Sequence, residues 1–218
     1  MTGLRLAEVD STQRIAAELV RAGERTYRYV LADHQTAGRG RRGAIWHSRP
    51  GSSFCASFML WRPFEPRVLL AAWAALVAAE KLPLADVRLK FPNDLMLMER
   101  KLGGCLVEMC GETAIVGVGI NLRIGACPPD LGVSLEEAGA FVDPVELAEA
   151  IADGLEAADK DWIERWRARD CSAGRRYRGQ ETGQEGVALG VDEALRLVIQ
   201  ADDGQVVSTH LAEGTIDR

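Results

Sequence analysis

Two apolar segments, residues 102–110 and 113–122, are separated by only the two residues Gly111-Glu112. A two-residue connection that begins with glycine is typical of a tight antiparallel hairpin, because glycine readily adopts the positive φ that such a turn requires. Each segment is long enough to cross a sheet. The sequence therefore predicts a sheet that contains at least one antiparallel pair of long strands.

Shorter patterns predict the other elements of the main body. Alternating or continuous apolar runs predict strands at residues 4–9, 27–32, 53–61, 87–90 and 95–98. Apolar residues at helical spacing predict three helices. The first follows a cap at Asp10-Ser11-Thr12, the second covers residues 67–81, and the third is one long helix from Asp143-Pro144 to Trp166. Together these predict an α+β fold, with a mixed β-sheet flanked by helices.

The C-terminal region has a different pattern. Residues 186–191, 195–200 and 206–210 are three short strand candidates joined by acidic turns. We expect a small SH3-like β-barrel here that docks on the main body, since so few residues are at the lower limit for folding alone. The expected domains are residues 1–170 and 171–218.

Composition limits the kinds of function. The chain of 218 residues has a formal net charge of −6, which argues against a broad nucleic-acid or membrane surface. Its apolar runs are too short to span a bilayer. The five cysteines are odd in number and scattered, as expected for reduced thiols in a cytoplasmic protein. The three histidines form no ligand pair.

One segment is strongly basic, although the chain as a whole has a negative net charge. Gly38-Arg39-Gly40-Arg41-Arg42-Gly43 concentrates positive charge, and Trp46 follows it. Glycines let backbone approach a ligand, and guanidinium groups suit phosphate or carboxylate, so this segment predicts an anion site. A flexible Arg/Gly surface loop is the alternative, and for an isolated segment of this composition it is the better interpretation.

Other residues add chemistry to the predicted site. Lys101 could neutralise charge on reacting anions, although taken alone it is better interpreted as an exposed turn residue. Asn93 and Asp94 carry hard oxygens suited to Mg²⁺ on a nucleotide, although taken alone they too are better interpreted as turn residues. Gly117 and Gly119 lie on one face of a strand and leave a slot there, or mark crowded packing. This pattern lacks the third glycine of a dinucleotide-binding fingerprint.

Taken in order, the segments Asp10-Ser11-Thr12, 35–43, 90–94 with 101–108, and 117–121 resemble the catalytic domain of the biotin protein ligases. The similarity extends through the helical region to the small C-terminal domain. The resemblance implies a two-step reaction: biotin and ATP form biotinyl-5′-AMP, and the biotinyl group then passes to a lysine of a biotin carboxyl carrier protein domain. The implied substrates and cofactor are biotin, ATP and Mg²⁺.

The resemblance also implies roles for individual residues. Lys101, Arg39 and Arg41 would act on the reacting groups, and Asp94 would bind Mg²⁺. Biotin would contact nine residues: Ser11, Thr12, Gln35, Gly38, Arg39, Gly104, Leu106, Gly117 and Gly119. ATP and the adenylate would contact six: Arg41, Arg42, Trp46, Asn93, Asn121 and Lys101.

Three positions depart from the commonest family pattern: Gln13, Phe91 and Cys105. The first motif begins at Asp10, which leaves no room for a DNA-binding helix-turn-helix, so we expect a ligase that is not a repressor. Two alternatives stay open, a lipoyl or octanoyl ligase or transferase of the same fold and a non-catalytic module that binds an acyl-adenylate. The sequence does not decide between a monomer and a homodimer.

Overall fold

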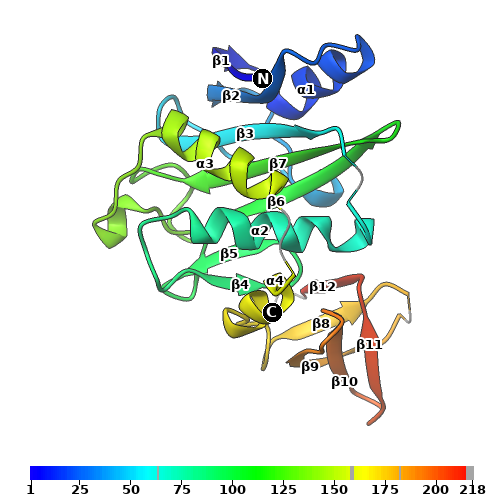
Figure 1. Ribbon diagram of the computed structural model, residues 1–218. Coiled ribbons are helices and arrows are strands. Elements are labelled where there is room, and N and C mark those ends of the chain that lie inside the picture. The colour runs from blue at the N-terminus through cyan, green and yellow to red at the C-terminus, as the bar shows by residue number, and fades with distance from the viewer. Residues whose placement is uncertain (63, 158–159, 182, 215–218) are drawn as a thin grey trace.

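The computed structural model describes residues 1–62, 64–157, 160–181 and 183–214 (Figure 1). Its main sheet has the strand order β1-β2-β3-β7-β6-β5-β4. Strands β1 and β2 are parallel, and every other neighbouring pair is antiparallel. The bounds are β1 (Thr2–Val9), β2 (Tyr27–Gln35), β3 (Ser53–Leu60), β4 (Arg88–Lys90), β5 (Asp94–Leu97), β6 (Arg100–Cys110) and β7 (Thr113–Asn121). The predicted mixed sheet is confirmed.

The predicted hairpin is formed by β6 and β7, which pair from Gly103↔Ile120 to Cys110↔Thr113. Gly111 has a φ of +61° at the first position of the connecting turn. This positive φ explains why glycine stands there, because a side chain would strain the backbone.

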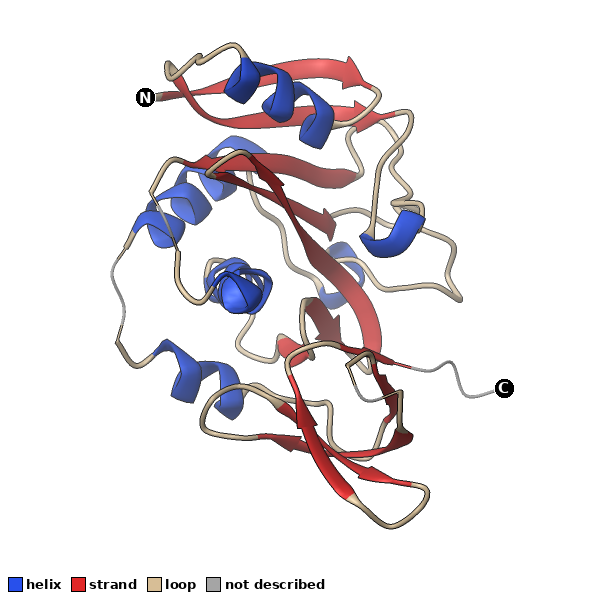
Figure 2. Ribbon diagram, turned by 90° about the vertical axis from the view of Figure 1, so that its right-hand side faces the viewer, coloured by secondary structure: helices blue, strands red, loops and turns tan. Residues whose placement is uncertain are grey.

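Helices cover the two faces of the sheet unequally. On one face α2 (Leu70–Glu80), α3 (Pro144–Glu156) and α4 (Trp162–Ala168) enclose the large apolar core (Figure 2). Along β3, the alternate residues Phe54, Ala56 and Phe58 belong to this core. On the other face α1 (Thr12–Arg21) packs over Met59, Val30 and Ile115. Short 3₁₀ turns occupy Arg41–Gly43, Arg67–Leu69 and Glu136–Ala138.

The expected single helix from residue 143 to 166 is wrong. Helix α3 ends at Glu156, and its C-cap residue Ala157 has an extended ψ of 136°. A second helix, α4, begins at Trp162; Ala158, part of the predicted stripe, lies outside the described residues. The apolar stripe continues across the break because Leu155 of α3 and Trp166 of α4 enter the same core. Asp143 caps α3 as expected, accepting from the backbone N–H groups of Val145 and Glu146.

The C-terminal region is a five-stranded antiparallel sheet with the order β11-β10-β9-β8-β12. Three of its strands match the expected ones: β9 (Glu185–Val191), β10 (Leu197–Ala201) and β11 (Val206–Thr209). Strand β10 begins two residues later than expected, because Leu195 lies in a turn with φ +55°. Two strands were not predicted: β8 (Arg176–Gly179) and β12 (Ala212–Gly214). Both are short and carry polar residues, so their sequences give little strand signal.

This small sheet is docked on the main one. The hydroxyl of Tyr177 donates to the carbonyl of Phe91 at 3.3 Å, and the N–H of Phe91 donates to Ser172 at 2.8 Å. Tyr177 and the inward residues of β9 and β10 join the core of the main body. Docking is as expected, while the domain boundary at residue 170 stays a prediction.

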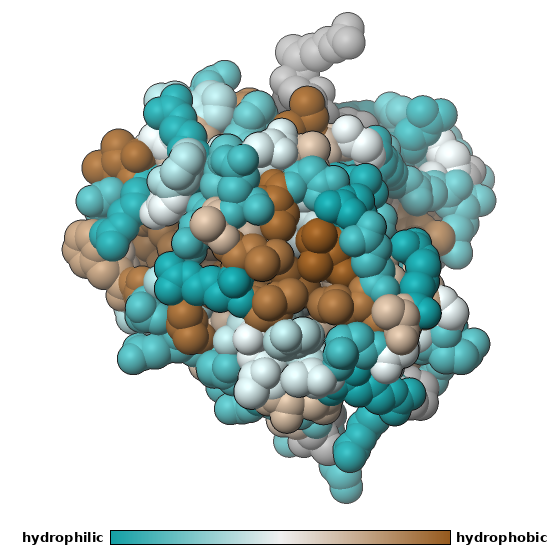
Figure 3. Space-filling model, turned by 90° about the horizontal axis from the view of Figure 1, so that it is seen from above, coloured by the Kyte–Doolittle hydropathy of each residue, from teal (hydrophilic) through white to brown (hydrophobic). Residues whose placement is uncertain are grey.

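Within the described ranges, no helix has the length and apolar character needed to cross a membrane. Figure 3 looks down on the β1 edge of the molecule and shows apolar side chains gathered in the middle of that face with polar ones around them. Apolar side chains of β1 and α1 that remain partly exposed include Leu4, Leu6, Ile15, Leu19 and Val20.

Candidate active site

A cavity of about 560 Å³ opens on the sheet face that α1 leaves partly uncovered. Residues that alternate with the core positions of three strands form its floor. They are Cys55 and Ser57 on β3, Gly104 and Leu106 on β6, and Gly117 and Gly119 on β7. The pairing registers place these residues side by side, since Cys55 pairs with Gly119 and Gly119 pairs with Gly104. The floor is therefore set by strand register, and its glycines leave room above it.

Two loops that are distant in sequence meet at the rim of the cavity, the Gly/Arg loop (residues 38–43) and the corner at residues 91–94, and Lys101 of β6 lies with them. Met98 and Glu99, in the turn before β6, do not line the cavity. Five cationic side chains and two carboxylates line the cavity; they are Arg39, Arg41, Arg42, Lys90 and Lys101, with Asp94 and Glu213. A site with this excess of positive charge in an acidic chain favours an anionic ligand.

Polar groups converge at the end of the cavity beneath α1. The amide oxygen of Gln35 accepts from the backbone N–H of Thr12 at 2.7 Å, so a residue of β2 satisfies the first N–H of the helix. Ser11 occupies the N-cap position, but its hydroxyl makes no capping bond. The Ser11 hydroxyl is buried and has no hydrogen-bond partner among the described residues. An unpaired buried hydroxyl that lines a cavity is positioned to bind a ligand.

At the other end, two cations are held by the corner at residues 91–94. Nη1 of Arg41 donates to Oδ1 of Asn93 at 2.6 Å, and Nζ of Lys101 donates to Oδ1 of Asp94, also at 2.6 Å. The Asn93 amide in turn donates to the carbonyl of Cys105 at 2.8 Å. Lys101 lies inside β6, one residue past its start, rather than in the preceding turn. Its place on a strand fixes its backbone firmly.

The remaining two arginines differ in their partners. Arg42 forms an ion pair with Glu213 of β12, which joins the Gly/Arg loop to the C-terminal sheet. Arg39 is exposed and makes no side-chain hydrogen bond or ion pair with any residue in the described ranges. A guanidinium group free of protein partners keeps all its donors for a ligand.

Burial shifts the pKa of two groups here. Burial first, and the positive charge of Arg42 second, lower the pKa of Arg41. Both causes destabilise the charged form of Arg41. An anion bound beside Arg41 would offset them, and the guanidinium charge would stabilise the anion. Burial raises the pKa of the Cys55 thiol to about 11, which keeps it protonated and unreactive at neutral pH.

Two of the floor glycines face side chains of the chain itself. A Cβ on Gly119 would lie 2.6 Å from the indole of Trp46, and one on Gly117 would lie 2.9 Å from the amide oxygen of Gln13. The slot expected above these glycines is thus occupied in part by Trp46 and Gln13. The indole N–H of Trp46 is buried without a partner in the described chain.

Two predicted site residues do not line the cavity. Gly38 lies behind the rim, where a Cβ would come within 2.6 Å of the carbonyl oxygen of Trp46. Asn121 donates to the carbonyl of Val133 at 3.1 Å and to the sulfur of Cys127 at 3.3 Å. In this structure Gly38 allows close approach of the loop backbone, and Asn121, at the end of β7, holds the segment after it. Their assigned contacts with biotin or adenine stay predictions. The other predicted site residues all line one cavity.

Sequence reasoning missed several lining residues. Ser57 is a polar residue inside an apolar strand, a signal that the sequence offered, whereas Cys55, Lys90 and residues 212–214 of β12 gave none. Among the departures from the family pattern, Phe91 and Cys105 belong to the apolar core, as expected for packing changes. All three residues, Gln13 included, also line the cavity.

Comparison with known proteins identifies the family of this chain. Residues 6–124 match the model of the "Biotin/lipoate A/B protein ligase family". The bifunctional ligase/repressor BirA of Salmonella typhimurium is 32% identical over 223 residues, which cover 90% of this chain and 69% of BirA. The biotin–[acetyl-CoA-carboxylase] ligase of Paracoccus denitrificans is 36% identical over 171 residues, covering 67% of this chain and 68% of that protein.

Among solved structures, the biotin protein ligase from Aquifex aeolicus in complex with biotin and ATP superposes with a TM-score of 0.81. It is 25% identical, and the match covers 98% of this chain and 99% of the Aquifex chain. The chain therefore belongs to the biotin/lipoate A/B protein ligase family. Within that family its relatives are biotin ligases, and the chain is a ligase of the biotin branch.

Proposed function

We propose that this chain joins biotin to AMP, giving biotinyl-5′-AMP, and then transfers the biotinyl group to a lysine of the carrier domain of a biotin-dependent carboxylase. The observation that carries the proposal is the cavity itself. Its polar end offers hydrogen-bonding groups without charge, and its opposite end gathers cations. Biotin is a molecule with the matching ends, a polar ring and a carboxylate.

In the first step a carboxylate oxygen forms a bond to the α-phosphorus of ATP, and the bond from that phosphorus to the β-phosphate oxygen breaks, releasing pyrophosphate. Two anions must approach each other, so catalysis depends on positioning and charge neutralisation. Lys101 and Arg39 line the same cavity and supply that charge. Arg41 adds a further guanidinium group, held by Asn93.

A magnesium ion is part of the proposal. Asp94 presents a carboxylate at the rim, and a single carboxylate suits Mg²⁺ when phosphates and water complete its shell. The Asn93 oxygen accepts from Arg41 instead. When bound, the ion would neutralise phosphate charge. The residues of this chain would bind and orient it.

In the second step the neutral amine of the carrier lysine attacks the acyl carbon and AMP leaves. The mixed anhydride must be kept from water until then. The Gly/Arg loop, with Trp46 lying on the cavity floor, is positioned to cover it. A neutral amine is required because a protonated one has no lone pair for attack.

The test is biotin-dependent exchange between ATP and pyrophosphate, with lipoate and octanoate as controls. Exchange with biotin alone supports the proposal, and exchange with lipoate alone overturns it. Transfer is tested separately with a biotin carboxyl carrier domain, by the gain in mass of one biotinyl group.

The variant Lys101→Ala should lose adenylate formation. Its circular dichroism spectrum should match that of the unmodified protein, because Lys101 is partly exposed and packs little. Full exchange activity in this variant would refute the role given to Lys101.

A further inference from the structure

Beneath α1, the side-chain amide of Gln13 has a fixed orientation. It is buried, and its Nε2 donates to the backbone carbonyl of Ile115 at 3.0 Å. A carbonyl oxygen only accepts, so the end of the amide near Ile115 is the NH₂ group. The amide oxygen therefore faces the hydroxyl of Ser57, 2.8 Å away, and Ser57 must be the donor in that contact.

The amide of Gln35 is fixed in the same way from the other side. The backbone N–H of Thr12 only donates, so the atom of Gln35 that it contacts at 2.7 Å is the amide oxygen. The NH₂ group of Gln35 is turned away from Thr12. It lies 3.1 Å from the point where a Cβ on Gly38 would sit.

Two hydroxyl groups, those of Ser57 and Thr12, connect the two amide oxygens. The oxygen–oxygen contacts are 2.8 Å from Gln13 to Ser57, 2.9 Å from Ser57 to Thr12, and 3.0 Å from Thr12 to Gln35. Three contacts share only two hydroxyl protons. Ser57 gives its proton to Gln13, so Thr12 gives its own to Ser57 or to Gln35. In either case Thr12 has no proton for a ligand, and its oxygen, which receives no hydroxyl proton, stays free to accept a hydrogen bond.

A donor belongs to the residue before Thr12. The hydroxyl of Ser11 lines the same cavity and is buried and unpaired within the described chain. This end of the cavity thus matches a group that carries N–H and C=O together, as a cyclic urea does. A ligand with only a sulfur-containing ring or an alkyl chain at this end, and no N–H or C=O group, would leave these polar groups unpaired. Each unpaired group would cost about tenfold in affinity.

We propose that Gln13 is a positioning residue for substrate choice: by taking the proton of Ser57, it keeps the Thr12 hydroxyl an acceptor for the N–H of a cyclic urea. The inference rests on the proposed function and names the group that sets its specificity. Gln13 acts through Ser57 and Thr12 rather than through the reaction itself.

Two variants remove the same hydrogen bond with different consequences. In Gln13→Leu, the proton of Ser57 is free to turn to Thr12, and Thr12 then donates to Gln35. The Ser57 proton then occupies a lone pair of the Thr12 oxygen and competes there with the N–H of the ligand. In Ser57→Ala, no serine proton remains, and Thr12 donates to Gln35 while its own oxygen stays open to the ligand. Gln13→Met, which also lacks the amide oxygen, replaces the leucine variant if that one does not fold.

Calorimetry with the full chain would compare biotin, desthiobiotin, which keeps the cyclic urea but lacks the sulfur ring, and octanoate. We expect Gln13→Leu to raise the Kd of both urea acids by about tenfold and to change that of octanoate by less than about twofold. Ser57→Ala should keep the ratio of octanoate to desthiobiotin Kd close to that of the unmodified protein.

The outcomes separate the inference from the function it rests on. An unmodified protein that binds biotin no more tightly than octanoate would overturn the proposed function. If it prefers the urea acids and Gln13→Leu keeps that preference, only the present inference fails. Equal loss of preference in both variants would also overturn it, because the Gln13–Ser57 bond would then be merely structural.

Discussion

Asn93 shows how one side chain can place another. Its NH₂ group is held by the carbonyl of Cys105, so its oxygen points to Arg41. We expect Asn93→Ala to release Arg41 and to raise KM for ATP by about tenfold, because the guanidinium group must then be ordered by the ligand alone. Steady-state exchange kinetics at varied ATP would measure this.

The control for this prediction is the affinity for biotin in the absence of ATP. Asn93 makes no contact with the polar end beneath α1, where Thr12 and Gln35 meet. The Kd of biotin in the absence of ATP should therefore be unchanged in Asn93→Ala. A parallel loss of biotin affinity would show that Asn93 supports the whole cavity.

Cys55 predicts a dependence of stability on pH. Its pKa is raised to about 11 in the folded protein from an ordinary value of 9.0. The folded state therefore holds the thiol proton more tightly, and its stability falls as pH rises from about 9 towards 11. Between pH 8 and pH 10 the unmodified protein should lose about 1 kcal/mol more unfolding free energy than Cys55→Ala.

Urea denaturation at the two pH values would measure that difference. Cys105 also has a raised pKa, but it is present in both proteins and cancels. Parallel losses in the two proteins would mean that the Cys55 thiol is not buried as the structure has it.

At this scale, the sequence pointed to the cations, and the family resemblance named Ser11, Thr12 and Gln35 of the neutral polar network but not Ser57. Arg39 and Lys101 are conspicuous because charge is rare on a buried strand or beside glycines. Ser57 was hidden because a serine within an apolar strand has many explanations. Its role follows from the register that sets it beside Thr12, and register is a property of the paired sheet.

At the scale of elements, the paired strands β6 and β7 each carry a glycine, Gly103 and Gly119, for a different reason. A Cβ on Gly103 would lie 2.5 Å from the backbone oxygen of Gly119, which has no freedom to move. We expect Gly103→Ala to cost about 2 kcal/mol of unfolding free energy. Chemical denaturation would measure it.

Gly119→Ala is the matched comparison. Its Cβ would meet the indole of Trp46, a side chain that can swing away on its loop. This variant should unfold within about 0.5 kcal/mol of the unmodified protein but lose adenylate retention, because Trp46 is displaced from the floor. Equal stability of the two variants would contradict the distinction.

Elements were predicted best where their pattern is long. The β6–β7 hairpin was found from its turn and its two apolar runs. The break between α3 and α4 was missed because periodicity reports which side chains face the core and not whether the backbone between them is helical. The short strands β8 and β12 are defined by their pairing with each other and with β9, which local sequence does not reveal.

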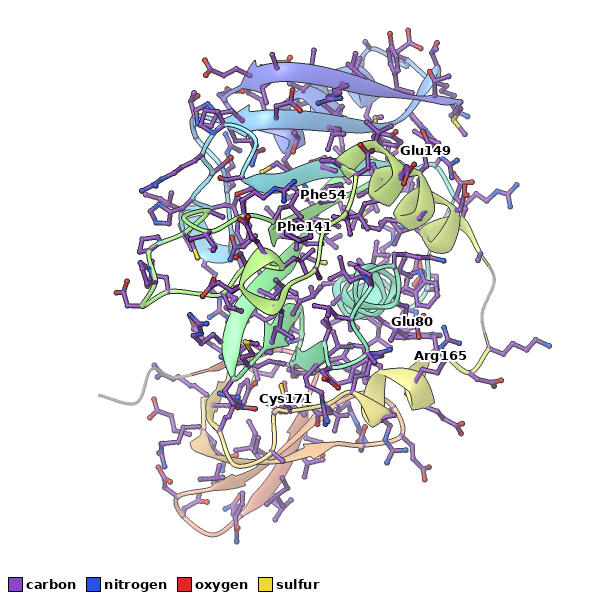
Figure 4. All side chains as sticks on the ribbon, turned by 90° about the vertical axis from the view of Figure 1, so that its left-hand side faces the viewer. Phe54, Glu80, Phe141, Glu149, Arg165 and Cys171 are labelled. Atoms are coloured by element: carbon purple, nitrogen blue, oxygen red, sulfur yellow. The ribbon has the colours of Figure 1, made fainter. Side chains whose placement is uncertain are left out.

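At the scale of the whole molecule, the two sheets share contacts along one seam. Figure 4 places Cys171 there, between the main body and the C-terminal sheet. Its backbone N–H donates to the carbonyl of Leu89, and Arg175 pairs with Glu99. The same view shows Arg165 of α4 turned towards Glu80 of α2, an ion pair at 2.9 Å.

These contacts predict one cooperative transition. Tyr177 is fully buried at the seam, so Tyr177→Ala should cost about 4 kcal/mol and lower the unfolding midpoint of the whole chain at once. Calorimetry would show a single shifted peak. Two separate peaks would show that the sheets unfold independently and would favour the expected boundary at residue 170.

The position of β12 has a practical consequence for anyone who modifies the chain. Residues 212–214 form part of the cavity wall. A bulky label attached to this strand would therefore lie next to the catalytic chamber. Strand β1 is a safer place for one, because Thr2 pairs with Tyr27, at the far end of β2 from Gln35.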